Sequence, residues 1–567
     1  MTLARWKVVP SPDPAEVQLL VTTLKLPKTL AELLVQRGYS VPDQAKQFLR
    51  PSLEGLTDPF LLKDMDVAVR IVADAVKSGR TILVHGDYDV DGQCSAALLT
   101  RILTLAGAHV IPFVPHRMKD GYDFGAAGLE MARKHGADVV VTCDCGVSAL
   151  ETVQQARDEG LQVVVTDHHL PGVLPPANAV VNPRREDCQS ASKELCGAGV
   201  AFKLAQALGS ELDIPENAPL HMLDLVALAT VADIVPLVGE NRTLVRYGLK
   251  MLEQSRWAGL RALVDVTRLS GKQIRAGQVG YVLAPRLNAV GRIGDAMDGL
   301  NLLLCDDERR AYDLARSLDT INARRQEIDE RLLDEAVEEI ETHIDLNSDY
   351  GLVLARDGWH PGVIGIVASR IVERYHRPTI MIGLEGDEGR GSGRSIPGFD
   401  LHDAIGRCAE HLVRWGGHKA AAGLTLKRQQ LQSFRTAFNE VASTELNAED
   451  LVPTQRVDIV GSIEALDDDL ERLMRHLEPC GPGNPAPVLG VERAQVRSPS
   501  TVGSNHLKFT LDDGTGTLQA IGFGWADRID REWLSKPVAV AFKLDRNEWR
   551  GSSTLQARIV QLAPTEP

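Results

Sequence analysis

Residues 81–92 read TILVHGDYDVDG, an apolar run followed at once by three aspartates at alternate positions. Two carboxylates about 4 Å apart repel by roughly 4 kcal/mol at an effective dielectric constant near 20, which is a large share of a domain's net stability. Cations between the carboxylates would remove that cost. The structural alternative is a solvated acidic turn, in which water screens Asp87, Asp89 and Asp91.

The D-x-D-x-D-G spacing of Asp87 to Gly92 also matches the start of an EF-hand calcium loop. That loop needs a bidentate glutamate at its twelfth position and a helix on each side. The twelfth position here is Leu98, and a strand-like segment precedes the loop. The pattern therefore excludes an EF-hand but leaves a metal site of another kind open.

Apolar runs alternate with helix-like stretches over about one hundred residues from Thr81 to Val181. The runs are residues 81–84, 109–114, 138–142 and 161–166, and the helical patterns begin near Gln93, Gly125 and Ser148. This rhythm is typical of βαβ units in a parallel sheet, and the continuous Val-rich strands imply burial on both faces. The sequence therefore predicts an α/β fold.

Acidic side chains follow several of these predicted strands directly. Asp144 comes after the run that ends at Thr142, and Asp167-His168-His169 come after the run that ends at Thr166. Because sites in open parallel sheets lie beyond the carboxyl ends of the strands, we expect these clusters to converge with Asp87 to Asp91. A fourth carboxylate, Asp233, interrupts the apolar stretch LVALATVADIVPLV, where it would be costly if buried and unpaired.

This set of side chains predicts a metal centre. Aspartate and histidine ligands without thiolates select against structural zinc and favour Mg²⁺ or Mn²⁺. Five or six such ligands exceed the needs of one octahedral ion with open water positions, so we predict two ions, as in two-metal phosphodiester and phosphate hydrolases. In those enzymes one ion activates a water and both stabilise the in-line transition state, so no covalent nucleophile is needed.

The rest of the chain predicts further domains. Residues 306–345 are highly charged with apolar residues in helical spacing, which predicts one long helix or two shorter helices with a bend. A second α/β domain with glycine-rich turns follows, then the linker-like Pro479 to Pro487, then short alternating strands typical of an OB-fold barrel. The predicted segments are an N-terminal segment (1–60), a first α/β domain (61–305), the connecting helix (306–345), a second α/β domain (346–450) and an OB-fold-like nucleic-acid-binding domain (451–567).

Composition limits the classes of protein. The 567 residues are 44% hydrophobic and carry a net charge of −15, which argues against a generic phosphate-binding surface, so a nucleic acid would need a localised groove. No apolar run approaches the roughly 18 residues of a membrane span, and the first residues lack a signal peptide's apolar stretch, so we expect a cytoplasmic protein. Eight cysteines without a C-x-x-C pair indicate reduced, mostly buried thiols.

Several motifs, in order, resemble the DHH phosphoesterase superfamily. In the first α/β domain they are VHGDYDVDG, VTCDCG, VVVTDHHLPG and LATVADIVPL; in the second they are LVLARDGWHPGVIGIVASRIVERYHRP, GRGSGRSIPG and GGHKAAAG. With its terminal barrel, the chain is similar to the bacterial members that degrade single-stranded DNA from the 5′ end. The likeness runs from about Leu61 to the C-terminus, and the first sixty residues carry no matching motif.

The resemblance implies a role for each residue of the centre. Asp89 binds one ion, with His85 and Asp87 completing that site; Asp91, His168 and Asp233 bind the other ion; Asp144 bridges the two. His169 faces the scissile phosphate, so the resemblance makes Asp89, Asp144 and His169 the catalytic residues. The alternative for His169 is a hydrogen-bonding role behind the metal ligands.

The resemblance also implies a pocket for a terminal 5′-phosphate. Arg117, Arg292, Ser392 and Arg394 line it, and Arg286, Asn288 and His418 are further substrate-binding candidates. Exposed glycine amides can cradle phosphate and arginine adds bidentate contacts. One stretch departs from the family, because Gly121-Tyr-Asp-Phe124 stands where relatives are expected to have Gly-Tyr-Gly.

The predicted barrel carries aromatic and basic side chains suited to a single strand. Trp525, Trp533, Phe542 and Trp549 are candidate stacking platforms, and Lys508, Lys543, Arg546 and Arg550 are candidate phosphate contacts. These residues favour a DNA-holding domain over a surface that docks only proteins.

We therefore predict a single-stranded-DNA-specific 5′→3′ exonuclease of DNA repair and recombination, which releases mononucleotides in a cleft between two α/β lobes. One alternative is a DHH phosphodiesterase of short oligonucleotides or cyclic dinucleotides, against which the C-terminal barrel counts. Another is an inactive single-strand-binding scaffold, against which the intact motifs count. A single-strand-binding protein and a helicase are candidate partners, no membrane is expected, and the chain is expected to be a monomer.

Overall fold

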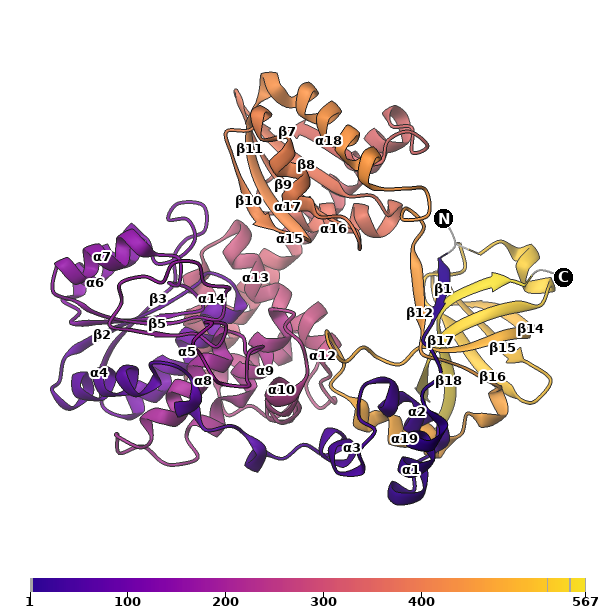
Figure 1. The fold of residues 1–567 in the computed structure, drawn as a ribbon, viewed down its shortest axis with the longest axis horizontal. Helices are drawn as coiled ribbons and strands as arrows, with labels where there is room; N and C mark the ends of the chain where they lie inside the picture. The colour runs from indigo at the N-terminus through magenta and orange to yellow at the C-terminus, as the bar shows by residue number, and fades with distance from the viewer. Residues whose placement is uncertain (1–3, 528, 550–551, 566–567) are drawn as a thin grey trace. The chain divides into compact units, whose positions relative to one another are not determined.

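The computed structural model describes residues 4–527, 529–549 and 552–565 (Figure 1). Its contacts divide the chain into two compact units, which are described one at a time. The first unit comprises residues 14–322 and 472–486, and the second comprises residues 1–13, 323–471 and 487–567. The five segments expected from the sequence are a finer division, which stays a prediction.

A five-stranded, wholly parallel sheet forms the centre of the first unit. The strand order is β3-β2-β4-β5-β6. The strands are β2 (Thr81–Gly86), β3 (His109–Phe113), β4 (Val139–Cys143), β5 (Gln162–Thr166) and β6 (Ala179–Val181). The predicted parallel α/β fold is confirmed.

Alternate residues of each strand enter two different cores, because successive strand side chains point to opposite faces. Ile82 and Val84 belong to one apolar cluster and Leu83 to the other. Helices α4 (Met65–Lys77), α5 (Val90–Leu105) and α8 (Gly197–Leu208) contribute to the first cluster, and α6 (Ala126–His135) and α7 (Leu150–Asp158) to the second. Burial on both faces, predicted from the Val-rich runs, is therefore found.

Helices that come before and after the sheet in the sequence complete the unit. Three lie within the first sixty residues: α1 (Pro14–Leu24), α2 (Lys28–Gln36) and α3 (Pro42–Leu49). Six follow the sheet: α9 (Leu223–Ala232), α10 (Gly239–Leu252), α11 (Ala258–Val266), α12 (Ala276–Gln278), α13 (Ala284–Ile293) and α14 (Ala296–Leu304). The α9 helix is almost wholly buried and ends at Asp233, which brings that carboxylate to the helix terminus.

A single helix, α15 (Glu308–His343), spans 36 residues, about 54 Å at 1.5 Å per residue. The one-helix alternative from the sequence is therefore correct and the bent pair is wrong. Leu318 is buried in the core of the first unit. The helix belongs to that unit up to Asn322 and to the second unit from Ala323 onward.

The second unit contains the predicted second α/β domain. Its mixed sheet has the order β10-β11-β9-β8-β7, in which only β7 and β8 pair in parallel. The strands are β7 (Leu352–Asp357), β8 (Thr379–Glu385), β9 (Glu388–Arg394), β10 (Arg414–His418) and β11 (Ala421–Lys427), and the helices are α16 (Ile364–Tyr375), α17 (Leu401–Arg407) and α18 (Leu431–Glu445).

The second unit also contains the predicted barrel. Five strands close on themselves in the order β14-β15-β16-β18-β17, with β14 pairing β17. They are β14 (Leu489–Val502), β15 (His506–Asp512), β16 (Thr517–Gly522), β17 (Val538–Trp549) and β18 (Ser552–Pro564). One pairing could not be expected from the sequence: β1 (Arg5–Val8) pairs in parallel with β12 (Thr454–Val457).

The segment expected to be a linker, Pro479 to Pro487, is packed rather than loose over its first residues. The buried guanidinium of Arg242 donates to the carbonyls of Phe48, His476, Leu477, Glu478 and Pro479. Asn484 is buried too, and its Nδ2 donates to the carbonyls of Leu477 and Pro479, 2.8 Å from each. Because these bonds fix the chain against α10, residues 472–486 belong to the first unit.

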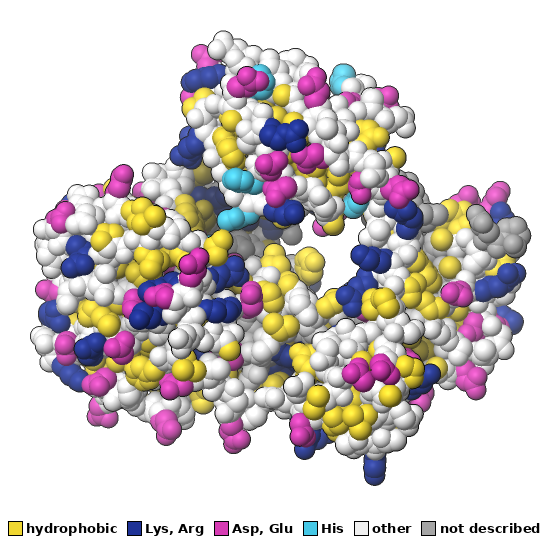
Figure 2. All heavy atoms as spheres, in the orientation of Figure 1, with side chains coloured by type: hydrophobic (Ala, Val, Ile, Leu, Met, Phe, Trp, Pro, Cys, Tyr) yellow, Lys and Arg dark blue, Asp and Glu magenta, His cyan; other side chains and the backbone are white. Residues whose placement is uncertain are grey.

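Other expectations from composition can be compared with the structure. None of the eight cysteines, all of which lie within the described ranges, forms a disulfide bond, and seven are buried. Among the described residues no helix has both the length and the apolar composition to cross a membrane. On the face drawn in Figure 2, Lys and Arg side chains are interspersed with Asp and Glu, in keeping with the acidic net charge.

Candidate metal centre

The first aspartates lie where β2 passes into α5. Asp89 is the N-cap of α5, and its Oδ1 accepts from the amides of Asp91 and Gly92 at 2.9 and 3.1 Å. The turn is so tight that a Cβ on Gly92 would lie 2.3 Å from the amide nitrogen of Asp87. Glycine is therefore required at position 92 for the carboxylates to fold back over the helix terminus, whose dipole favours negative charge.

Asp91 is buried and fixed by a second helix terminus. Its two carboxylate oxygens accept from the amides of Gly197 and Ala198, at 2.6 and 2.7 Å, at the start of α8. A Cβ on Gly197 would meet the Cβ of Asp144 at 2.4 Å. The start of α8 thus fixes the direction of Asp91 and touches Asp144 as well.

Asp144 follows β4 in a left-handed conformation, with φ of +62°. Only glycine, asparagine and aspartate adopt this region readily, and such strain collects at functional sites. Its amide donates to the carbonyl of Thr166 at 3.0 Å. The Oδ1 atom of Asp144 is buried and has no hydrogen-bond partner among the described residues.

His168 lies at the centre of the cluster. Its Nε2 is 3.0 Å from Oδ1 of Asp144, 3.5 Å from Oδ2 of Asp233 and 3.8 Å from Oδ2 of Asp91. Neither ring nitrogen has a hydrogen-bond partner within the described part of the chain. Burial and the neighbouring His169 lower the pKa of His168 to about 3, so the ring is a neutral imidazole, the form that binds metals.

Three groups of side chains bring their ligand atoms within 4.8 Å of one another: Asp87, Asp89 and Asp144; Asp91, His168 and Asp233; and Asp144, His168 and His169. Asp144 belongs to two groups, and its Oδ1 lies 3.0 Å from Nε2 of His168, which also belongs to the group of Asp91 and Asp233. Buried polar atoms without partners are rare and costly, and hard cations accept such oxygen and imidazole ligands. These residues therefore fit Mn²⁺ or Mg²⁺.

The electrostatics agree with this fit. Burial first, and then the neighbouring aspartates, raise the pKa of Asp91 to about 7 and that of Asp233 to about 8. Burial also raises the pKa of Asp87 and of Asp144 well above the ordinary value, assisted by Asp89 and Asp91 respectively. These carboxyls resist ionisation unless positive charge is close.

His169 stands at the edge of the cluster with its side chain 40% exposed. Burial by itself would lower its pKa, but the hydrogen bond from Nδ1 to Oδ1 of Asp167, 2.7 Å long, outweighs burial and raises the pKa to about 9. On the other side, Nε2 lies 3.4 Å from the Tyr122 hydroxyl. His169 is therefore a cation that points one nitrogen away from its carboxylate partner.

His85 lies apart from the three ligand groups. Its ring packs against Phe113 and Phe124, and its Nδ1 is 3.6 Å from the thiol of Cys145. Burial lowers the pKa of His85 to about 4, and Nε2 has no partner within the described ranges. A ligand role for His85 stays a prediction.

The predicted strand-binding residues of the first unit gather around Tyr88. The Arg117 guanidinium lies 5.1 Å from the centre of the Tyr88 ring, and a Cβ on Gly291 would touch the Tyr88 carbonyl oxygen at 2.6 Å. Arg292, next along α13, is therefore near the same loop. Arg286 is differently engaged, because its Nε donates to Asp319 at 2.9 Å and its Nη1 to the Val282 carbonyl. Asn288 is half-buried on α13.

The predicted 5′-phosphate residues of the second unit share one end of its sheet. Ser392 and Arg394 lie on β9, and His418 lies on β10. Arg394 and His418 both face Ala421 of the strand between them. Nη1 of Arg394 donates to the Ser392 hydroxyl at 3.1 Å, and a Cβ on Gly365 would lie 2.8 Å from that hydroxyl. These residues form one local polar group beside α16.

The predicted DNA-contacting residues of the barrel differ in their burial and in their partners. Phe542 is fully buried in the barrel core, so the expected stacking role is wrong: alternate strand residues face inward, and this one does. Trp525 and Trp533 pack against that core while half-buried. Arg546 is occupied by Glu471 and Asp468. The side chain of Trp549 and the whole of Arg550 lie outside the described residues.

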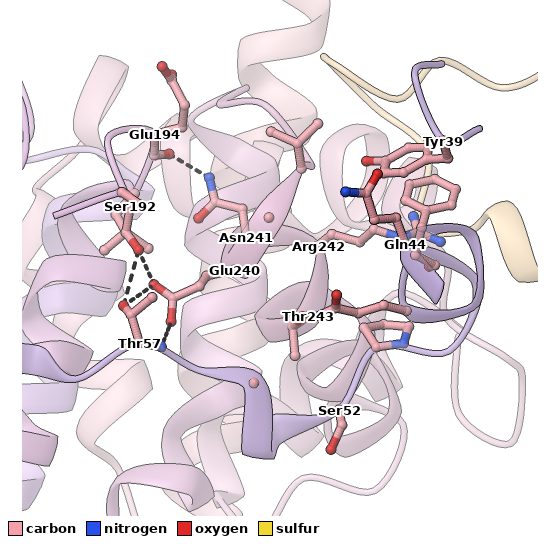
Figure 3. Close-up of a pocket in the computed structure, with 18 residues that line it drawn as sticks. Tyr39, Gln44, Ser52, Thr57, Ser192, Glu194, Glu240, Asn241, Arg242 and Thr243 are labelled. Atoms are coloured by element: carbon pink, nitrogen blue, oxygen red, sulfur yellow. Dashed lines mark hydrogen bonds between the residues drawn. The ribbon is translucent and has the colours of Figure 1, made fainter. Parts of the chain in front are cut away.

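A pocket of about 390 Å³ in the first unit lies away from these residues (Figure 3). It separates residues 39–57 from the start of α10. Glu240 turns toward Thr57 and Ser192, and the Thr57 amide donates to its carboxylate at 2.6 Å. Lys203 neutralises the same carboxylate at 2.7 Å. None of the lining residues is a predicted site residue.

Sequence reasoning missed the residues that orient the ligands. Asp167 sits inside a motif, yet its hydrogen bonds to three nitrogens of His168 and His169 need the folded turn. Asp123, the departure noted above, accepts from the Gly146 amide at 2.6 Å. No pattern in the sequence indicates that contact, because the two residues lie on loops after different strands.

Comparison with known proteins agrees with this geometry. Three family models match: the DHH family N-terminal domain over residues 81–230, the DHHA1 domain over 348–444 and the RecJ OB domain over 457–561. The chain is 38% identical to the single-stranded-DNA-specific exonuclease RecJ of Dickeya dadantii, over 95% of this chain and 96% of that protein.

Two solved structures of RecJ from Thermus thermophilus are similar over 99% of this chain. The complex with Mn²⁺ has a TM-score of 0.85 and 32% identity, covering 80% of that chain, and the complex with Mg²⁺ has 0.80 and 31%, covering 79%. Sequence and domain order thus agree with these relatives, and the chain belongs to the RecJ family of single-stranded-DNA-specific exonucleases.

Proposed function

We propose that the chain is a metal-dependent exonuclease that degrades single-stranded DNA from the 5′ end and releases mononucleotides, in DNA repair and recombination. Family membership over nearly the whole chain supports the reaction class. The observation that carries the proposal is the Asp144 carboxylate, which belongs to two groups of metal-ligating side chains at once. The OB domain at residues 457–561 counts against a phosphodiesterase of short oligonucleotides.

In this proposal the chain holds two Mn²⁺ or Mg²⁺ ions. Asp87 and Asp89 bind one, Asp91, His168 and Asp233 bind the other, and Asp144 bridges them. When bound, the ions lower the pKa of the attacking water and neutralise charge on the phosphoryl oxygens. His169, kept cationic by Asp167, donates a hydrogen bond to a phosphate oxygen as negative charge develops on it.

The remaining predicted residues hold the strand. In this proposal Arg117, Arg292, Ser392 and Arg394 bind the terminal 5′-phosphate, and His418 is a further substrate-binding residue. Capture of that end group sets the 5′→3′ polarity, because the distance from the end to the metal ions decides which bond breaks. Arg286 and Asn288 are further substrate-binding residues on α13, where Arg286 donates a hydrogen bond to Asp319.

The test uses single-stranded oligonucleotides labelled at the 5′ or the 3′ end, with Mn²⁺. The wild-type chain is expected to release labelled mononucleotide from the 5′ end at once, and Asp144→Ala to retain strand binding with no hydrolysis. Addition of EDTA is expected to stop the reaction. Substantial hydrolysis by purified Asp144→Ala would refute the bridging role, and release from the 3′ end first would refute the polarity.

The cellular setting is also proposed. The protein acts in the cytoplasm as a monomer, on strands exposed by a helicase and covered by a single-strand-binding protein. Light scattering on the purified chain tests the monomer, and titration with each purified partner tests the contacts.

A further inference from the structure

Asp144 is held in an unfavourable backbone geometry by a turn that continues through Cys145 and Gly146. Gly146 has φ of +105°, and a Cβ there would lie 2.5 Å from the Thr142 hydroxyl. The Thr142 hydroxyl donates to the carbonyl of Cys145 at 2.8 Å. A non-glycine residue with positive φ, such as Asp144, persists only where surrounding contacts hold it.

Two carboxylates from other loops supply those contacts. The Gly146 amide donates to Oδ1 of Asp123 at 2.6 Å, and the next amide, of Val147, donates to Oδ2 of Asp167 at 2.9 Å. Asp167 already has a role, since it orients His169. Asp123 touches no candidate ligand directly, and its contact on the turn remains to be explained.

Asp123 itself is suited to its position. Its φ is +77°, a left-handed conformation that aspartate and asparagine tolerate and most other residues do not. The same Oδ1 accepts from the Phe124 amide at 2.8 Å, so the carboxylate ties its own loop together. The preceding residue, Tyr122, places its hydroxyl 3.4 Å from Nε2 of His169. One side chain thus links the Tyr122 loop to the Asp144 turn.

We propose that Asp123 is a positioning residue that aims the Asp144 carboxylate between the two ion positions through the Gly146 amide. This inference rests on the proposed two-ion function. Asp123 acts as a hydrogen-bond acceptor rather than through its charge, so an amide side chain can replace the carboxylate. It also accounts for the departure from the Gly-Tyr-Gly expected of relatives: a side chain at position 123 braces a turn that glycine would leave unbraced.

The test compares Asp123→Gly with Asp123→Asn. Glycine adopts the same φ without strain but has no acceptor, whereas asparagine keeps Oδ1 and tolerates the conformation. Mn²⁺ binding is measured without DNA, from the electron paramagnetic resonance signal of free Mn²⁺, and melting temperature is measured alongside. Asp123→Gly is expected to weaken Mn²⁺ binding about tenfold, as loss of a group behind a metal ligand does. Asp123→Asn is expected to restore it.

Arg268→Gly is the matched control, because Arg268 is exposed and also left-handed, with φ of +59°. It is expected to leave Mn²⁺ binding unchanged. Wild-type affinity in Asp123→Gly would overturn the inference, and so would equal weakening in Asp123→Gly and Asp123→Asn. Absence of 5′-exonuclease activity in the wild-type chain would instead overturn the proposed function, since the Mn²⁺ titration does not depend on DNA.

Discussion

Asp233→Asn should stabilise the metal-free protein and reduce the stabilisation that Mn²⁺ provides. In the folded state burial, Asp91 and Asp89 raise the pKa of Asp233 to about 8, against an ordinary value near 3.8. The native state therefore binds more protons than the unfolded state between these two values. Stability falls as pH rises through that window, because ionisation is easier in the unfolded chain. Below pH 4 the penalty is absent, and above pH 8 it is complete.

The size of the penalty follows from about 1.36 kcal/mol per pH unit. It reaches at most about 2 kcal/mol at pH 5.5 and about 5 kcal/mol at pH 7.5, since part of it is shared with Asp91. Asparagine cannot ionise, so it removes this cost. At roughly 2 °C per kcal/mol for a large domain, the melting temperature of Asp233→Asn in EDTA should exceed the wild-type value by more at pH 7.5 than at pH 5.5.

Addition of Mn²⁺ should narrow this difference, because wild type gains more from the ion than Asp233→Asn does. Mn²⁺ at one hundred times its dissociation constant stabilises the folded protein by about 2.7 kcal/mol. Asp233→Asn loses part of that gain, because it removes one of the carboxylates proposed to bind the ion. Differential scanning fluorimetry at both pH values, with EDTA or Mn²⁺, measures all four states. Asp224→Asn is the matched control on the same helix: burial raises the pKa of Asp224 to about 6, but its partners are Ser255 and Leu225. Equal Mn²⁺ stabilisation of Asp233→Asn and wild type would refute the reasoning.

Three further outcomes are expected. Asp167→Asn removes the carboxylate that raises the pKa of His169 to about 9, so the alkaline limb of the kcat profile should move to lower pH; an unchanged limb would separate His169 protonation from catalysis. Arg394→Lys should raise KM about tenfold for 5′-phosphorylated strands and leave 5′-hydroxyl strands unaffected, because lysine loses the bidentate contact; equal effects on both would contradict a 5′-phosphate site. Arg242→Ala removes the donor to five carbonyls and should lower the free energy of unfolding by about 3–5 kcal/mol in a denaturant titration. An unchanged denaturation midpoint would contradict a stabilising role for these hydrogen bonds.

Much of the fold could be predicted from sequence because its signals are local. The Val-rich runs of β2, β4 and β5 show strand length and burial without any partner in view. Most of the candidate metal ligands were singled out for the same reason, since they follow strands and the carboxyl ends of parallel strands share one edge; Asp233 follows α9 instead, and the ligand roles stay predictions. The α15 helix left two alternatives open, because periodicity does not reveal a bend.

The features that were not predicted depend on contacts between distant segments. The pairing of β1 with β12 joins residues more than four hundred positions apart, and neither tetrapeptide carries a distinctive pattern. The segment that begins at Pro479 reads as a linker from its glycines and prolines, yet the buried Arg242 donates to the Pro479 carbonyl. The side chain of Phe542 faces the interior of the barrel, and only the closed barrel shows which face of the strand points inward.

Backbone strain and carboxylate repulsion at the metal centre require a surrounding fold that holds the ligands in place. Asp144 and Ile234, which follows Asp233, both adopt left-handed backbone conformations, with φ of +62° and +60°, at a cost of about 1–3 kcal/mol each. Repulsion among buried carboxylates adds to that strain in the metal-free state. A flexible scaffold would relax both by moving the ligands apart. Here the sheet is buried on both faces, the α8 terminus holds Asp91, and Asp123 and Asp167 brace the Asp144 turn, so the ligands are kept together and the charge is relieved by protonation or by cations.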